Sequence, residues 1–164
     1  MRIKRFFALF LLVASLLFVT SCKDVRAGWC ELWLVFPHSY EKIETDGSFD
    51  AAYSDGEAVV GITRMSFEAA IDDGIPTTLT PLRFAEEYKS RVGLDDYTVK
   101  ERGDVPYLVY YTREDDGIYT HLASFYKSYY AYFAVTFVCK SDVEDSYLED
   151  FYEIMDSAYL DYGE

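Results

Sequence analysis

Residues 130–139, with the sequence YAYFAVTFVC, place the strongest constraint on the fold of this chain. In a β-strand successive side chains point to opposite faces, and here both alternating sets are apolar. One set is Phe133, Val135 and Phe137, and the other is Tyr132, Ala134 and Val138. A strand that is buried on both faces lies in the middle of a sheet that is covered on both sides. The fold therefore requires a covered sheet.

Six other segments are predicted as strands, and several are bounded by turn signals. They are residues 30–36, 49–53, 57–66, 97–101, 107–113 and 118–126. The turns at residues 54–56 and 115–117 each end in Asp-Gly, which favours a tight hairpin between the flanking strands. Residues 72–79 lack an apolar period and are predicted as a loop.

Two helices are predicted from their ends and their apolar spacing. The first has Thr80 as N-cap and Pro81 as its first residue, where the missing N–H costs no hydrogen bond, and it ends at Gly93. Ser141 and Glu144 fit a capping box at the start of the second. The apolar residues at helical spacing are Phe84, Tyr88 and Val92 in the first helix, and Val143, Tyr147, Phe151, Ile154 and Ala158 in the second.

The predicted order is three strands, a helix, four strands and a helix, within a single domain over residues 30–160. Strands joined by short turns pair antiparallel. We therefore expect an α+β fold in which a mostly antiparallel sheet of six to seven strands is covered by helices on both faces, as an α/β/α sandwich.

Residues 1–21 are predicted to be a targeting segment that precedes the domain. Three basic residues lie within its first five positions, and residues 6–20 are uncharged, too few for a membrane-spanning helix of about 20. The sequence V-T-S-C at residues 19–22 resembles the bacterial lipobox. The resemblance implies that Cys22 receives a diacylglyceryl thioether and becomes the new N-terminus. The alternatives are an ordinary signal peptide cleaved nearby and an uncleaved anchor.

The chain is strongly acidic, with 15 Lys and Arg against 29 Asp and Glu and a formal charge of −14, which argues against nucleic acid as a partner. Removal of residues 1–21 leaves −17 over 143 residues. Acyl chains contribute about 0.8 kcal/mol per buried CH₂, so lipid at Cys22 holds the protein on a membrane without a basic patch. With residues 22–29 as a short tether, we expect a domain on the extracytoplasmic side of the cell membrane.

The domain resembles the PsbP-like family in the spacing of four short motifs. These are Phe36-Pro37 followed by Tyr40, Gly103-x-x-Pro106-Tyr107, Gly117-x-Tyr119, and Phe133-x-Val135-x-Phe137 before the last helix. The family includes the photosystem II extrinsic subunit PsbP, the Mog-type Ran-binding proteins and many small bacterial lipoproteins. The resemblance covers about residues 30–160 and implies the sandwich fold. It also implies a non-enzymatic binding or assembly role, by analogy of fold.

Two cysteines, Cys30 and Cys139, remain beside Cys22. A disulfide is chemically permitted outside the cytoplasm, and closing a loop of about 110 residues would contribute about 4–5 kcal/mol in the chain-entropy model. Both residues lie in predicted strands, however, and free Cys is among the most buried residue types. Two buried thiols are therefore favoured over the disulfide.

Motifs of the common enzyme and metal sites are absent from the sequence. There is no Gly-x-Ser-x-Gly elbow, phosphate loop, dinucleotide fingerprint or zinc-ligand spacing, and no acidic segment has the EF-hand pattern of ligands. A nucleophile formed by His121 and Cys139 would need contact between them and an electropositive setting, which an acidic chain offers poorly. We predict no catalytic activity, no cofactor and no metal.

Eight of the 16 tyrosines lie between residues 107 and 132. The favoured interpretation is that they fill strands and the space under the helices, because Tyr suits a half-buried pleated surface. The alternative is an exposed aromatic surface at strand ends, formed by Tyr119, Tyr126, Tyr129 and Tyr130, since Tyr is enriched at interfaces.

These observations predict a membrane-anchored extracytoplasmic lipoprotein that binds or helps to assemble another extracytoplasmic protein, with its acidic surface favouring basic partners. The alternative is a lipoprotein that binds a small molecule or carbohydrate in an aromatic-lined pocket, followed by an unrecognised hydrolase. A shallow aromatic surface would support protein binding, and a large closed pocket would support a small ligand.

Overall fold

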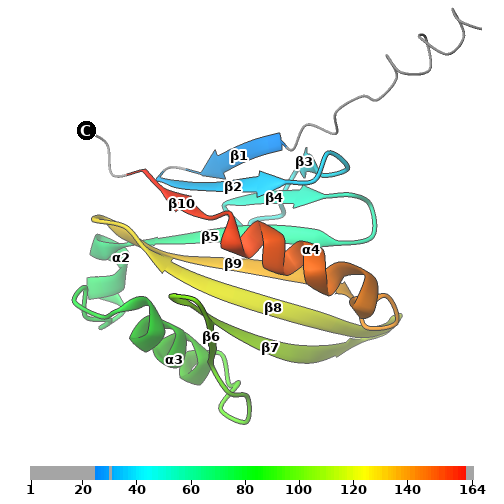
Figure 1. Cartoon of the computed structure of the whole chain (residues 1–164). Helices are drawn as coiled ribbons and strands as arrows, with labels where there is room; N and C mark the ends of the chain where they lie inside the picture. Colours follow the sequence, from blue (N-terminus) through cyan, green and yellow to red (C-terminus); the bar gives the residue numbers. More distant parts are fainter. Residues whose placement is uncertain (1–24, 30, 162–164) are drawn as a thin grey trace, which may run out of the picture.

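A seven-stranded antiparallel sheet forms the centre of the computed structural model, which describes residues 25–29 and 31–161 (Figure 1). In spatial order its strands are β3 (Glu41–Ile43), β4 (Ala51–Ser54), β5 (Val59–Ser66), β9 (Ala131–Lys140), β8 (Gly117–Lys127), β7 (Val105–Glu114) and β6 (Lys100–Arg102). A second sheet contains β1 (Val25–Trp29), β2 (Leu32–Phe36) and β10 (Tyr159–Leu160). The helices are α2 (Phe67–Asp72), α3 (Pro81–Arg91) and α4 (Glu144–Asp156).

Strand β9 has the central place that its sequence predicts. It pairs with β5 on one side and β8 on the other, and residues 131–137 are all buried. Phe137 packs against Phe151 of α4, with ring centroids 5.1 Å apart. On the alternate set, Tyr132 stacks on Phe84 of α3 at 4.3 Å. The two sets of β9 side chains therefore belong to separate core clusters.

The α+β class and the antiparallel seven-stranded sheet confirm the coarse prediction, but one strand lies elsewhere. Residues 30–36 were expected in the main sheet, whereas β2 pairs with β1 and β10. Its Leu32 and Leu34 are buried in the cluster that also contains α4 side chains, so β2 forms a second layer over that core. Residues 25–29, expected within a tether, form β1.

Helix α3 begins as predicted, whereas the capping box of α4 is wrong. Thr80 Oγ1 accepts a hydrogen bond from the Arg83 N–H at 3.3 Å. At α4, Glu144 instead accepts from the Thr120 hydroxyl of β8 at 3.0 Å, and Ser141 Oγ lies 2.8 Å from that same hydroxyl. A partner from the neighbouring sheet replaces the local one, and α4 has no side-chain cap.

Candidate binding surface

The turn between β8 and β9 exposes two neighbouring tyrosines. Tyr129 is 67% exposed and Tyr130 63% exposed. Their ring centroids lie 6.5 Å apart at an interplanar angle of 72°, in the edge-to-face arrangement that aromatic pairs favour. Of the four tyrosines in the aromatic surface predicted from sequence, these two are exposed next to each other on this turn, and their binding role stays a prediction.

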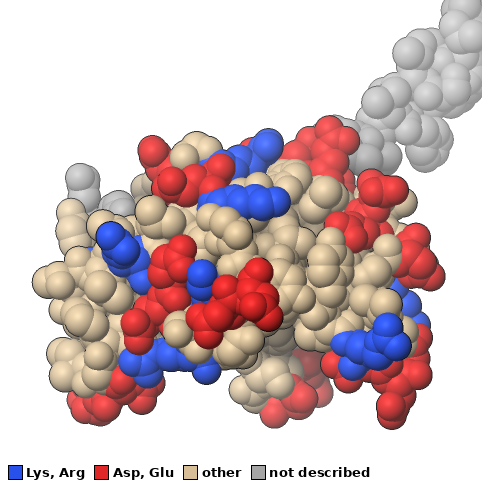
Figure 2. All heavy atoms as spheres, turned by 90° about the horizontal axis from the view of Figure 1, so that it is seen from below, with Lys and Arg blue, Asp and Glu red and all other residues tan. Residues whose placement is uncertain are grey.

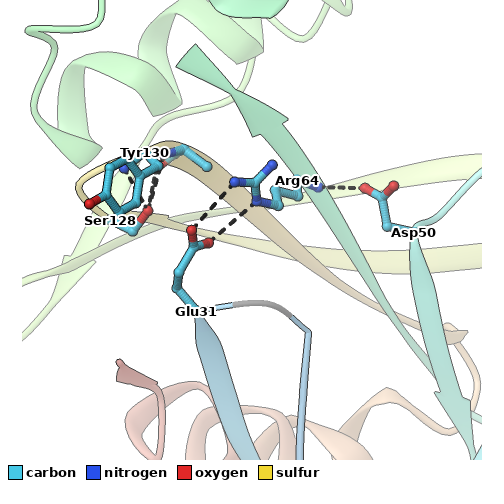
Figure 3. Close-up of polar contacts among 6 residues, drawn as sticks. Glu31, Asp50, Arg64, Ser128 and Tyr130 are labelled. Atoms are coloured by element: carbon cyan, nitrogen blue, oxygen red, sulfur yellow. Dashed lines mark hydrogen bonds and ion pairs between the residues drawn. The ribbon is translucent and has the colours of Figure 1, made fainter. Parts of the chain in front are cut away.

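Hydrogen bonds hold this turn in one conformation. Buried Ser128 accepts through Oγ from the N–H groups of Tyr130 and Ala131, both at 3.1 Å (Figure 3). The Ser128 N–H donates to the Ala131 carbonyl at 2.9 Å, and the Tyr130 carbonyl accepts from the Phe67 N–H of α2 at 2.9 Å. The tyrosines thus stand on a support that is tied to both β9 and α2.

Helix α2 extends the apolar surface beside the turn. Phe67 packs on Tyr132, with centroids 5.2 Å apart, and Ile71, one helical turn later, is largely exposed. The exposed acidic residues of this segment are Glu68, Asp72 and Asp73. We call Ile71, Tyr129 and Tyr130 the tip surface. Its members are exposed apolar and aromatic side chains on α2 and on the neighbouring turn. Exposed acidic residues lie on α2, and the Lys127 ammonium lies 5.6 Å from the Phe67 ring centroid.

An ion pair near Tyr130 joins the two sheets (Figure 3). Arg64 of β5 donates through Nε to Glu31 Oε2 at 3.3 Å and through Nη2 to Glu31 Oε1 at 3.4 Å. The Arg64 N–H also donates to the Asp50 carboxylate at 2.7 Å. Because Glu31 directly precedes β2, this contact fixes that end of the small sheet to the main sheet.

The other two tyrosines of the predicted surface lie elsewhere, so that part of the prediction is wrong. Tyr126 is 6% exposed, its hydroxyl donates to the Met155 carbonyl at 3.1 Å, and burial raises its pKa. Its place on β8 puts it on the core-facing side with Leu122. Tyr119 lies at the opposite end of β8, where its hydroxyl donates to Asp116 at 2.9 Å. Only Tyr129 and Tyr130 are brought together.

The structure separates Cys139 from His121, which rules out the proposed nucleophile. In the β8–β9 register Thr120 lies opposite Cys139, and His121 lies opposite Val138, so the two side chains project from opposite faces. Cys139 is a buried free thiol, and burial raises its pKa to about 11. Cys22 and Cys30 lie outside the described residues, and the lipid attachment and the disulfide remain predictions.

Acidification is expected to destabilise the domain through His121. Its ring stacks on Tyr110 at 4.7 Å, and burial lowers its pKa. The His121 ring therefore takes up a proton more readily in the unfolded chain than in the folded one. As a result, the free energy of unfolding falls as the pH drops below about 6.5. Urea denaturation at pH values on either side of about 6.5 measures this loss. His121→Gln should reduce it and exposed His38→Gln should not; an equal response in both variants would contradict the assignment.

The surface hollows lined by Tyr119 and Tyr152 are shallow and charged. Their volumes are about 420 and 430 Å³, and each contains one aromatic ring among acidic and basic side chains. They differ from the aromatic-lined pocket expected for a carbohydrate ligand. Within the described ranges, no group of three His, Cys, Asp or Glu side chains is arranged to hold a metal ion.

Charge on the face shown in Figure 2 is mixed. Lys and Arg side chains are scattered among Asp and Glu, and no continuous basic area forms on this face. None of the helices in the described part of the chain is long and apolar enough to cross a membrane.

No protein-family model matches the chain, and no curated protein matches it. Solved structures do match. A protein from Bacteroides thetaiotaomicron is 14% identical with a TM-score of 0.57, over 84% of this chain and 48% of that one. Cyanobacterial PsbP (CyanoP) from Synechocystis sp. PCC 6803 is 11% identical with a TM-score of 0.51, over 87% and 95%. The fold is PsbP-like.

A third similar structure is LpqN, involved in cell envelope biogenesis of Mycobacterium tuberculosis. It is 7% identical with a TM-score of 0.53, over 87% of both chains. The chain spans about half the length of the Bacteroides protein. At these identities the likeness shows the fold, and it agrees with the resemblance carried by the sequence motifs.

Proposed function

We propose that this protein is a membrane-anchored extracytoplasmic lipoprotein that binds a partner protein through the tip surface. The observation that carries the proposal is the pair Tyr129 and Tyr130, both mostly exposed on a turn fixed by hydrogen bonds. Aromatic residues are enriched at the centres of protein interfaces. A turn whose backbone is already held in place loses less conformational entropy on binding.

The exposed acidic residues of the α2 segment favour a basic partner. Exposed Glu68, Asp72 and Asp73 flank Ile71, and the mature chain carries a formal charge of −17 after removal of residues 1–21. Complementary charge accelerates association and disfavours acidic competitors. The partner is accordingly a protein with an apolar contact area bordered by Lys or Arg.

The anchor and the scaffold complete the proposal. Acylation at Cys22 is supported by the lipobox resemblance, and the involvement of LpqN in cell envelope biogenesis supports an extracytoplasmic location. The scaffold is the predicted α/β/α sandwich, supported by the separate core clusters that contain α3 and α4 side chains. We propose a non-enzymatic role. In keeping with it, the buried Cys139 thiol and the half-buried His121 ring point to opposite faces of the sheet and form no Cys–His pair.

Site-specific crosslinking in the native cell tests the proposal. A photoreactive phenylalanine analogue in place of Tyr130 is expected to crosslink the full chain to one partner protein. The same analogue in place of Tyr111, an exposed tyrosine of β7, serves as the matched control. Tyr129→Ser with Tyr130→Ser should abolish this crosslink from a neighbouring position, Ile71, while the unfolding midpoint stays nearly constant, because surface changes cost about 0.5 kcal/mol or less. Equal crosslinking from positions 130 and 111 would overturn the proposal.

A further inference from the structure

The small sheet of β1, β2 and β10 leaves an apolar face exposed. Leu32 and Leu34 of β2 are buried. Because successive side chains of a strand alternate between its faces, Trp33 and Val35 point away from the core. Trp33 is 38% exposed, and Tyr159, directly opposite it in β10, is 63% exposed. We call Trp33, Val35 and Tyr159 the outer face. Paired aromatics on an exposed sheet face mark a contact surface.

Chain connectivity identifies what lies nearest to this face. Strand β1 pairs with β2 and begins at Val25, three residues after Cys22. An extended chain covers at most about 3.6 Å per residue, so a lipidated Cys22 lies within about 11 Å of the start of β1. The tether expected from sequence, residues 22–29, is shortened by the five residues that enter the sheet. Of the whole domain, the small sheet is therefore held nearest to the bilayer.

We propose that the outer face rests on the lipid headgroups, with Trp33 and Tyr159 in the interfacial layer. The proposal rests on the membrane anchoring proposed above. Trp and Tyr are the residues enriched at membrane–water interfaces, because each combines an apolar ring with a polar group. Exposed Glu153 of α4 borders the face at Val35. None of the three outer-face side chains is charged, and Glu31 beside them is paired with Arg64. This face can therefore approach lipid although the domain as a whole is acidic.

The contact orients the domain on the membrane. In Figure 1 the small sheet lies along the top of the molecule, and β7 and α3 lie at the bottom. The tip surface belongs to α2 and the β8–β9 turn, in the layer of the main sheet. With the outer face on the bilayer, the tip surface stays open to a partner protein at the side of the domain.

Lipid quenching of tryptophan fluorescence tests the contact. The mature protein is purified from membranes and placed in phosphatidylcholine vesicles whose acyl chains carry bromine. A Trp29→Phe variant leaves Trp33 as the sole tryptophan, and its emission is expected to be quenched severalfold. A matched variant, Trp29→Phe with Trp33→Phe and Tyr111→Trp, places the reporter on β7, and its emission should be little affected.

Flotation of the same vesicles separates the two proposals. Protein that does not float with the vesicles would overturn the anchor and this inference together. Protein that floats while Trp33 is no more quenched than the reporter at position 111 would overturn the inference and leave the anchor standing. A blue-shifted Trp33 that bromine does not quench would show that protein, such as a second copy of the chain, covers the face instead.

Discussion

Replacement of Tyr126 by serine is expected to lower the free energy of unfolding by about 3–5 kcal/mol, in the range of large-to-small core changes. The ring is buried in the cluster that contains Phe133 and Met155. Its removal leaves a cavity, and the Met155 carbonyl loses the hydroxyl that now donates to it at 3.1 Å. Urea denaturation of the two proteins measures the difference, and a constant m-value shows that both unfold in the same way.

Tyr130→Ser is the matched control, because it makes the same chemical change four residues along the chain. The Tyr130 ring is mostly exposed, and changes at such positions fall within about 0.5 kcal/mol. A comparable loss in both variants would contradict the assignment of Tyr130 to the surface. An unchanged Tyr126→Ser protein would contradict the burial of Tyr126 and return it to the aromatic surface predicted from sequence.

The main elements could be predicted because their signals are local. Residues 130–139 carry apolar side chains on both faces of the strand, and this predicts the central position of β9. The Asp-Gly sequence predicts the turn before β8. The missed elements are short. Strand β10 has two residues and forms through pairing with β2, far away in the sequence. Helix α2 has six residues, too few for a clear helical period.

The sequence predicted only part of the candidate surface. The exposure of Tyr129 and Tyr130 follows from their place in the turn between β8 and β9. The predicted strands 118–126 and 130–139 leave Tyr129 between them, whereas Tyr130 was expected as the first residue of the next strand. Tyr126 was missed because it lies in the stretch of β8 at residues 122–126 that is buried on both faces, so its place near the end of the predicted strand did not imply exposure. Trp33 could have been placed correctly. Residues 30, 32, 34 and 36 are all apolar and include the buried set, whereas Trp33 shares its face with the charged Glu31.

Replacement of Cys22 by alanine is expected to abolish incorporation of a fatty-acid analogue into the protein. Alanine has no thiol to carry the diacylglyceryl thioether. The diacylglyceryl group supplies the two acyl chains that stable anchoring needs, and its loss removes this anchor. Labelling in the native cell and the intact mass of the protein measure the change together. Cys139→Ala is the control, and it should keep the label since that thiol is buried.

The intact mass distinguishes the two alternatives if the natural chain carries no label. An unlabelled protein that lacks residues 1–21 would indicate an ordinary signal peptide, and one that retains them would indicate an uncleaved anchor. Retention would still hold the small sheet near the bilayer, because only four residues separate the uncharged segment 6–20 from β1. An ordinary signal peptide would remove this constraint, and nothing would then hold Trp33 and Tyr159 at the bilayer.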